Sequence, residues 1–303
     1  MPKLMILSQN ADEYKQLLES TQLPELELTT DPKSCEVVLG DTKSIKDALP
    51  LLSNLRWVQT TSAGVEHLVD PTQRHDYVLT NARGMFGEAM SEYVFGYILF
   101  WEKKIPERIR AQQAKQWQRS EPGVLHGKTI GLLGVGSIGA HLAGTAKHFR
   151  MTVRGFTRES ETSKQVDQYF HGDDILKFAD GLDYLVSVLP RTEDTNRIVD
   201  AHMLNALPTH AVFINVGRGN AVDEAALVKA LQEGRLAAAV LDVFDKEPVP
   251  ADHPFWTTPN LYMTFHTSAI TYPPDMAKLF AENYRLYMEG KPLKHQVDFE
   301  RGY

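Results

Sequence analysis

The sequence predicts an α/β protein built from two Rossmann-like domains, each a doubly wound parallel sheet, with an intervening cleft. Two observations support this fold class. The chain has 303 residues, and since a domain usually has roughly 100–200 residues, this length favours two domains. Short apolar runs also alternate with amphipathic stretches along both halves, which is the pattern of βαβ units. With 43% hydrophobic and 23% charged residues, the chain has the composition of a globular protein with a sizeable core.

The first βαβ series lies in residues 1–98. Its expected strands and the helical segments between them are Leu4–Leu7, Ala11–Glu19, Glu36–Leu39, Ile45–Leu52, Arg56–Thr60 and Tyr77–Thr80. Strands that alternate with helices in this way pair in parallel, because each helix returns the chain to the same end of the sheet.

The second βαβ series begins near Lys128. Its expected strands are Thr129–Leu133, Thr152–Phe156, Tyr184–Val188, Val212–Val216, Ala238–Val243 and Leu261–Thr264. Helices are expected at Ser137–Phe149 and Asp223–Glu233, and Tyr93–Trp117 is a helix-rich segment that joins the two series. The last long helix, Asp275–Glu289, follows the final strand, so it is able to return to the first domain.

The charge and composition of the chain limit the classes of binding partner that it is expected to have. The net charge is −7 and no long basic run is present, which argues against nucleic acid as the main partner. No segment approaches the ~18 uninterrupted apolar residues that span a bilayer, and the N-terminus lacks the features of a secretory signal. Cys35 is the only cysteine, which excludes an intrachain disulfide. We therefore expect a cytoplasmic protein with no nucleic-acid or membrane partner.

The segment Gly134-Val-Gly136-Ser-Ile-Gly139 has the G-x-G-x-x-G pattern and lies between an expected strand and an expected helix. In that context Gly134 permits a tight turn, Gly136 lets the backbone approach a pyrophosphate, and Gly139 lets helix and strand pack closely. The phosphates would lie at the positive end of the helix, beside Ser137 and Ile138. The alternative is a glycine-rich turn that binds no ligand. We predict an NAD(P) site.

The residues after the next strand bear on the choice between NAD and NADP. An acidic residue there would bind the ribose 2′-hydroxyl, but the sequence has Thr157 followed by Arg158. A hydroxyl and a guanidinium favour a 2′-phosphate. NADP(H) is therefore the preferred cofactor, with NAD(H) also possible. Two alternatives stay open: Arg158 is only a solvated loop residue, or Glu159 weakens the preference.

The position of the glycine motif predicts which domain binds the dinucleotide. Residues 99–273 are the predicted dinucleotide-binding domain. The predicted substrate domain is discontinuous and consists of residues 1–98 plus 274–303.

Three segments that follow expected strands offer groups for redox chemistry on a small acid. They are Asn215-Val-Gly-Arg218-Gly219, Leu241–Pro248 with Glu247, and Thr264–Ser268 with His266. Reduction of a 2-oxo acid needs a proton for the carbonyl oxygen, and histidine titrates near neutral pH. A carboxylate beside it favours the imidazolium, and an arginine can hold the carboxylate of the substrate. Taken singly, such an arginine is usually a surface residue and such a histidine a structural one.

Six segments of the chain are distinctive in sequence and in order. They are SAGVEHL (Ser62–Leu68), GLLGVGSIG, SVLPRTEDTNRIVD (Ser187–Asp200), NVGRGNAVDE (Asn215–Glu224), LDVFDKEPVP (Leu241–Pro250) and HPFWTTPN (His253–Asn260). In these segments and their order, the chain resembles the D-isomer-specific 2-hydroxyacid dehydrogenase family. The ending QVDFERGY and the loop GFTRES are most similar to its glyoxylate/hydroxypyruvate reductase A branch.

The resemblance implies roles for single residues. Arg218 would hold the substrate carboxylate and polarise its carbonyl, His266 would be the general acid/base, and Glu247 would pair with His266. Asp242 would meet the nicotinamide amide. Further cofactor contacts are expected from Leu189, Pro190, Thr195 and Val216, and substrate contacts from the turn of Ser62, Ala63, Gly64 and Val65. No metal ion is expected.

The resemblance also implies a homodimer, with Phe100–Trp117 as the expected contact, although this segment equally suits an intrachain helix face. In one respect the chain departs from the family. Phe265 stands where proline usually precedes the catalytic histidine, so the loop of His266 differs in rigidity and pocket shape.

The predicted reaction is NAD(P)H-dependent reduction of a small 2-oxo acid to the D-2-hydroxy acid, and the reverse. Glyoxylate and hydroxypyruvate are the expected substrates, and larger 2-oxo acids stay open. The main alternative is a dinucleotide-sensing binding protein, like the transcriptional corepressor relatives of the family. A formate dehydrogenase-like enzyme is disfavoured because that branch has glutamine where Glu247 stands. A phosphoglycerate dehydrogenase stays open within the enzyme class: no obvious cluster of additional basic residues for a phosphate is present, but a fold can assemble one from separate segments.

Overall fold

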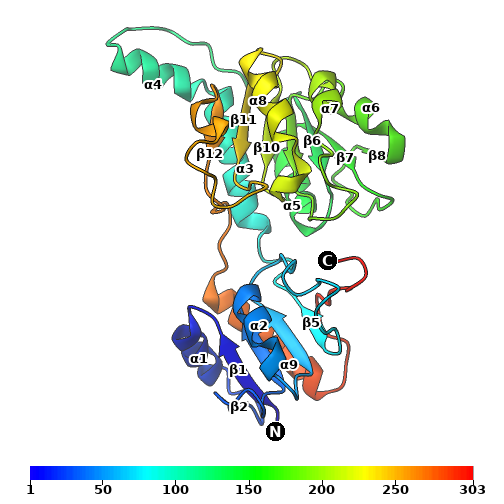
Figure 1. Cartoon of the computed structure of the whole chain (residues 1–303). Coiled ribbons are helices and arrows are strands. Elements are labelled where there is room, and N and C mark those ends of the chain that lie inside the picture. Colours follow the sequence, from blue (N-terminus) through cyan, green and yellow to red (C-terminus); the bar gives the residue numbers. More distant parts are fainter. Residues whose placement is uncertain (303) are drawn as a thin grey trace. The chain divides into compact units, whose positions relative to one another are not determined.

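The computed structural model describes residues 1–302 and divides into two compact units. The first consists of Met1–Met85 and the residues from Thr271 onward, and the second of Phe86–Ile270. Each unit has one parallel sheet with helices packed against it (Figure 1). The predicted α/β fold with two doubly wound sheets is confirmed.

The first unit contains a five-stranded sheet in the order β2-β1-β3-β4-β5. Its elements in chain order are β1 (Lys3–Leu7), α1 (Ala11–Ser20), β2 (Glu27–Leu28), β3 (Val37–Gly40), α2 (Thr42–Ala48), η1 (Leu49–Leu51), β4 (Trp57–Thr60), β5 (Val78–Thr80) and α9 (Pro273–Met288). The strands β3 and β4 are buried along their whole length, because helices cover both faces of the sheet.

The C-terminal residues complete the first unit. In α9, the ring of Phe280 stacks on Trp57 with a centroid distance of 5.0 Å. Asn283, which is fully buried, donates to Gln59 Oε1 at 2.9 Å and accepts from the backbone N–H of Lys294 at 2.7 Å. These bonds fix the segment that follows α9 against the sheet.

The second unit contains a seven-stranded sheet in the order β12-β11-β10-β9-β6-β7-β8. Its strands are β6 (Thr129–Leu133), β7 (Thr152–Phe156), β8 (Gln168–Phe170), β9 (Tyr184–Ser187), β10 (Val212–Asn215), β11 (Ala238–Leu241) and β12 (Leu261–Met263). Its helices are α3 (Gly87–Glu102), α4 (Ile105–Gln113), α5 (Ser137–His148), α6 (Ile175–Ala179), α7 (Ala201–Ala206) and α8 (Glu224–Gln232), with the 3₁₀ turns η2 (Gly172–Asp174), η3 (Gly219–Ala221) and η4 (Pro254–Thr257).

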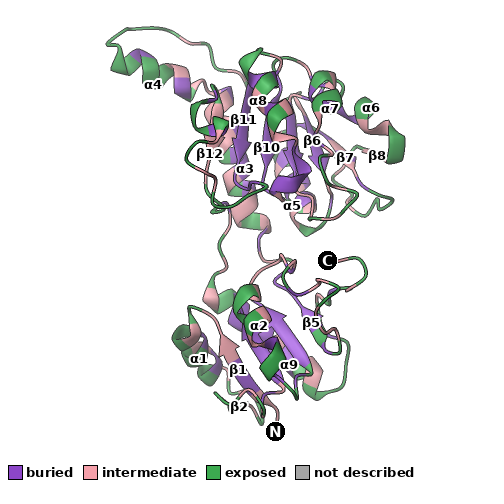
Figure 2. Ribbon diagram, in the orientation of Figure 1, coloured by how far each residue is buried: buried purple, intermediate pink, exposed green. Residues whose placement is uncertain are grey.

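All seven strands pair in parallel, and the strand order reverses between β6 and β9. In open α/β sheets, ligands bind at such a switch point, beyond the carboxyl ends of the strands. We call this end of the second sheet the carboxyl edge. Separate apolar clusters of buried residues pack on the two faces of the sheet, so its central strands β6, β9, β10 and β11 are almost entirely buried (Figure 2).

The compact units divide at positions that differ from the expected domain boundaries of 98/99 and 273/274. The helix α3 lies wholly in the second unit because Val94, Phe95 and Ile98 share one buried cluster with Leu142 of α5. A boundary at residue 98 would cut this helix. Towards the C-terminus, the hydroxyl of Thr271 donates to the backbone carbonyl of Thr61 at 2.6 Å, so the first unit resumes there.

The sequence analysis did not identify four short elements, namely β2, β8, α6 and α7. Each has between two and six residues, which is too few to show a period of two or of 3.6. None of the helices among residues 1–302 is long and apolar enough to cross a membrane.

Candidate active site

The predicted site residues of the second unit gather at its carboxyl edge. This follows from the parallel pairing, because every segment after a strand starts from the same end of the sheet. The segments are Gly134–Gly139 after β6, Thr157 and Arg158 after β7, Leu189, Pro190 and Thr195 after β9, Val216 and Arg218 after β10, Asp242 and Glu247 after β11, and His266 after β12.

The glycine turn has the close packing that a dinucleotide site requires. Gly134 has a φ of 94° and donates its N–H to Phe156 O at 2.9 Å. A Cβ on Gly139 would lie 2.3 Å from Gly134 O, so only glycine lets α5 start this close to the turn. A Cβ on Gly136 would meet nothing within 4 Å, which leaves open space beside its backbone.

The N-terminus of α5 is free to bind an anion. Gly136 is the N-cap residue and supplies no side-chain cap, whereas Asp200 caps α7 and Asp223 caps α8 with their carboxylates. The first N–H groups of a helix have no partner within the helix and lie at its positive end. Together with the open space at Gly136, they fit a pyrophosphate group.

Thr157 and Arg158 follow β7 as predicted, but in different environments. Thr157 is buried, and its hydroxyl donates to Ser160 O at 2.7 Å. Arg158 is exposed and pairs with Asp194 at 2.9 Å, where the side chains are 60% and 76% exposed. An ion pair as exposed as this contributes about 0–1 kcal/mol, so a ligand phosphate can replace Asp194.

His171 is a residue at this edge that the sequence analysis missed. It follows β8, the neighbour of β7, and its Nδ1 lies 3.0 Å from Thr157 O. Its Nε2 lies 3.0 Å from Glu161, and that hydrogen bond is the largest cause of a raised His171 pKa. The available signal was its position directly after a strand, but β8 itself was not predicted.

His266 and Glu247 form the pair expected for general acid/base chemistry. His266 Nδ1 lies 2.8 Å from Glu247 Oε2, and Glu247 Oε1 accepts the backbone N–H of Phe244 at 2.9 Å. One carboxylate oxygen therefore contacts the ring, and the other fixes the carboxylate itself to the backbone. A carboxylate that accepts from Nδ1 leaves Nε2 as the nitrogen able to exchange a proton with a ligand.

The turn that carries His266 has an uncommon backbone. Phe265 has a φ of 53° and His266 a φ of 60°, so two consecutive non-glycine residues are left-handed. Proline is locked near φ −65°, and therefore could not take the place of Phe265 in this turn. The departure from the family pattern thus corresponds to a different turn. Phe265 is exposed and stacks on Trp256 at 5.8 Å.

Arg218 lies in a segment that its neighbours hold tightly. Its carbonyl accepts from Asn215 Nδ2 at 3.1 Å, and its Nη1 donates to Gly217 O at 2.8 Å. A Cβ on Gly219 would lie 1.8 Å from the carbonyl carbon of Phe244. The backbone after Arg218 therefore packs directly against the loop that carries Glu247.

The turn of Ser62–Val65 belongs to the first unit and follows β4. Its carbonyls are occupied: Ser62 O accepts from Ala82 N at 3.1 Å, and Ala63 O accepts from Asn81 Nδ2 at 2.9 Å. No hydrogen bond within residues 1–302 uses the N–H groups of Ala63, Gly64 or Val65. Consecutive N–H groups without partners are suited to binding an anion.

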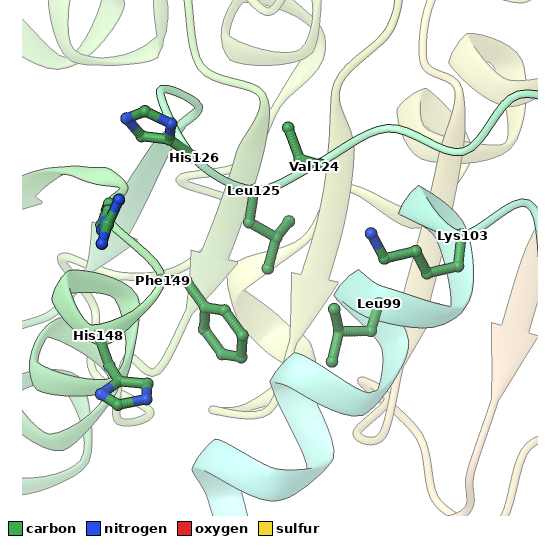
Figure 3. A pocket seen from close by; sticks show the side chains of 8 residues that line it. Leu99, Lys103, Val124, Leu125, His126, His148 and Phe149 are labelled. Atoms are coloured by element: carbon green, nitrogen blue, oxygen red, sulfur yellow. The ribbon is translucent and has the colours of Figure 1, made fainter.

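A cavity of about 340 Å³ in the second unit is separate from these residues (Figure 3). It is lined by Leu99, Lys103, Val124, Leu125, His126, His148, Phe149 and Arg150. These residues precede β6 and β7 or end α3 and α5, so the cavity lies at the amino ends of the strands. None of the predicted site residues lines it. Within residues 1–302, no group of three His, Cys, Asp or Glu side chains is placed to hold a metal ion.

Comparison with known families identifies the chain. A family model described as "D-isomer specific 2-hydroxyacid dehydrogenase, NAD binding domain" matches residues 95–268, which is more than half of the sequence. The chain belongs to the D-isomer specific 2-hydroxyacid dehydrogenase family. As a member, it is an NAD(P)-dependent oxidoreductase, and the second unit is its dinucleotide-binding domain.

Individual relatives of this 2-hydroxyacid dehydrogenase agree with the predicted branch. Glyoxylate/hydroxypyruvate reductase A of Klebsiella pneumoniae is 30% identical over 82% of each chain. A family member from Aeromonas salmonicida has a solved structure with a TM-score of 0.92 and 39% identity, covering 98% of this chain and 99% of that one. Another, from Xanthobacter autotrophicus in complex with NADPH and MES, has a TM-score of 0.92 and 32% identity, covering 100% and 99%. The resemblance to the reductase A branch is confirmed.

Two glycines of α5 offer a matched test of the dinucleotide turn. Gly139→Ala should weaken NADPH binding by about 10- to 100-fold, because overpacking by one methyl group costs about 1–3 kcal/mol where its Cβ meets Gly134 O. Gly144→Ala, where a Cβ meets nothing within 4 Å, should leave NADPH binding unchanged and stabilise the helix by about 0.5–1 kcal/mol. Calorimetric titration with NADPH measures both. Equal affinities for the two variants would contradict the packing argument.

Proposed function

We propose that this 2-hydroxyacid dehydrogenase reduces small 2-oxo acids of the glyoxylate and hydroxypyruvate type to D-2-hydroxy acids, and catalyses the reverse reaction. The observation that carries the proposal is the pair of His266 and Glu247, 2.8 Å apart at the same edge of the sheet as the glycine turn. The similarity to glyoxylate/hydroxypyruvate reductase A of Klebsiella pneumoniae supports the substrate class.

The proposed chemistry divides between the cofactor and the side chains. A bound reduced nicotinamide dinucleotide supplies the hydride for the carbonyl carbon. His266 donates a proton from Nε2 to the carbonyl oxygen, and accepts it back in the oxidative direction. Glu247 fixes the orientation of the ring through Nδ1.

The carboxylate of the substrate needs its own partners. We propose that the guanidinium of Arg218 binds it and polarises the neighbouring carbonyl. The N–H groups of Ala63, Gly64 and Val65, which have no partner within residues 1–302, are the proposed second group of donors. The first unit is accordingly the proposed substrate domain.

The proposed cofactor contacts follow the order of the strands. The pyrophosphate would lie at the N-terminus of α5, where a Cβ at Gly136 would meet nothing within 4 Å and no side chain caps the helix. The residues proposed to hold it are Gly134, Gly136, Ser137, Ile138 and Gly139. The remaining proposed contacts are Leu189, Pro190, Thr195, Val216 and Asp242, all of which lie beyond the carboxyl ends of β9, β10 and β11.

NADP(H) is the proposed preferred cofactor. Arg158 is exposed and pairs with the exposed carboxylate of Asp194, which a 2′-phosphate can replace, and no acidic side chain occupies the position of Thr157. The 32% identical relative from Xanthobacter autotrophicus was crystallised with NADPH. Use of NAD(H) is also proposed, because Glu159 and Glu161 lie near the same loop and disfavour a dianion.

A homodimer in the cytoplasm is the proposed state of the enzyme. Most of the helix α4 and of the segment after it is exposed (Figure 2). The exposed residues include large apolar ones, with Ile109 44% and Trp117 96% exposed. Exposed apolar groups of this size on one segment are typical of an interface. The cytoplasmic location is proposed from the single cysteine, Cys35, which is buried and free.

The decisive experiment measures reduction of glyoxylate and hydroxypyruvate with NADPH by the wild type and by His266→Ala. The wild type should turn over both acids. His266→Ala should lower kcat by about 10²–10⁴-fold, because positioned acid catalysis contributes that much, while NADPH binding survives. If the wild type reduced neither acid, the proposed substrate class would be wrong, and if His266→Ala kept the kcat of the wild type, another group would have to donate the proton.

Two further variants serve as controls in that experiment. Arg218→Ala should raise KM for the 2-oxo acid as well as lowering kcat, since the substrate loses its main charge partner. Glu247→Gln should lower kcat less than His266→Ala. This variant keeps the imidazole that exchanges the proton and replaces the charged acceptor at Nδ1 with a neutral amide.

Arg158→Ala tests the cofactor preference. The variant should raise KM for NADPH about 10- to 100-fold and leave KM for NADH nearly unchanged, because only NADPH loses a charge-assisted bond of roughly 1.5–3 kcal/mol. Steady-state kinetics with both cofactors and one 2-oxo acid give the comparison. If KM rose equally for NADPH and NADH, the proposed role of Arg158 in the cofactor preference would be wrong.

Light scattering tests the oligomeric state. The wild type should have twice the chain mass of 34.1 kDa at micromolar concentration. Ile109→Glu should produce monomers, whereas Leu176→Glu, which places the same charge on the exposed face of α6, should leave the dimer intact. A monomeric wild type would contradict the dimer, and a dimeric Ile109→Glu variant would exclude α4 as the interface.

A further inference from the structure

The left-handed turn at Phe265 and His266 needs an external support. Two consecutive non-glycine residues with positive φ are disfavoured, and such a conformation persists only where the surrounding structure holds it. Phe265 and His266 are themselves exposed, so their side chains do not anchor the turn by burial. The support has to come from the residues on either side of them.

The carboxylate of Asp242 provides that support. Its Oδ1 accepts the hydroxyl of Thr264 at 2.7 Å, the backbone N–H of Thr267 at 2.8 Å and that of Ser268 at 3.1 Å. Asp242 is fully buried, and its backbone carbonyl also accepts the N–H of His266 at 2.6 Å. Donors before and after the turn therefore converge on one buried anion, which fixes both ends of the turn.

Tyr93 extends this network from α3. Its hydroxyl oxygen lies 2.5 Å from Thr264 Oγ1. The hydroxyl of Thr264 has a single proton, and an ionised carboxylate can only accept, so that proton belongs to the bond with Asp242. Tyr93 must then donate to Thr264. Burial raises the pKa of Tyr93 above its usual value, which keeps it a protonated donor.

We propose that Tyr93 is a positioning residue for the proposed reaction: through Thr264 and Asp242 it holds the turn in which His266 pairs with Glu247. Donation into Thr264 polarises the hydroxyl that bonds to the buried carboxylate, and such bonds strengthen one another in a chain. This role rests on the proposed function of His266. Tyr93 was not identified from the sequence, because it lies about 170 positions from its partner.

The kinetic test compares Tyr93→Phe with Tyr97→Phe. Tyr97 lies one turn further along α3, packs against Tyr93 at 5.0 Å and makes no side-chain hydrogen bond within residues 1–302. Tyr93→Phe should lower kcat about 2- to 10-fold, the usual effect of one lost neutral hydrogen bond, with KM for the 2-oxo acid and for NADPH unchanged. Tyr97→Phe should leave all three constants unchanged.

Thr264 supplies a second, independent set of variants. Thr264→Val removes the hydroxyl at nearly constant volume and should lower kcat at least as much as Tyr93→Phe. Thr264→Ser retains the hydroxyl and should restore most of kcat. Because both residues act through one chain of bonds, the Tyr93→Phe and Thr264→Val effects should not multiply in the double variant. Multiplicative effects, or a change in KM in place of kcat, would overturn the proposal.

A spectroscopic measurement tests the inference without turnover. The Nδ1–H proton of His266, bonded to Glu247, should give a downfield proton NMR signal that Glu247→Gln abolishes and so assigns. In Tyr93→Phe this proton should exchange with water faster than in the wild type, and in Tyr97→Phe at the wild-type rate. Equal exchange in the two tyrosine variants would overturn the role of Tyr93. Lack of 2-oxo acid turnover by the wild type would refute only the proposed function.

Discussion

The parallel pairing of the seven-stranded sheet is the constraint on which the candidate site depends. Its strands are only three to five residues long, and the central strands β6, β9, β10 and β11 are buried almost throughout, so their side chains serve packing. The loops that follow the strands are not part of this packing, so they can carry functional side chains. Because the strands are parallel, all of these loops begin at the carboxyl edge. Groups more than a hundred residues apart, such as Gly134 and His266, thereby reach the same edge of one sheet.

The buried carboxylate of Asp242 is stabilised by the same hydrogen bonds that hold the turn of His266. An unpaired carboxylate in an apolar interior is strongly disfavoured, and here three donors of residues 264–268 compensate it. The same bonds hold two residues in a left-handed turn. The cost of burying the charge and the strain of the turn are thus offset by one set of hydrogen bonds, and the exposed His266 is placed precisely although its own side chain is not packed.

Two basic side chains that follow β7 and β8 are paired with carboxylates. Arg158 pairs with Asp194, and His171 pairs with Glu161, whose hydrogen bond raises the His171 pKa. Each cation is therefore held at the surface by a carboxylate when no ligand is bound. Exposed pairs of this kind exchange partners at little cost, which is compatible with binding of a phosphorylated ribose and with tolerance of an unphosphorylated one.

The sequence by itself determined the fold class, all strands of the two sheets except the short β2 and β8, and the segments that carry Gly134, Arg218, Glu247 and His266. Periodicity and short motifs are local properties, so they can be read from the sequence alone. Its family resemblance also named the pairing of Glu247 with His266. Only the tertiary structure decided the boundary before α3, the left-handed turn at Phe265, and the contacts of His171 and Tyr93. These depend on which surfaces pack and on which buried donors reach one carboxylate, and the partners lie far apart along the chain, where no local pattern relates them.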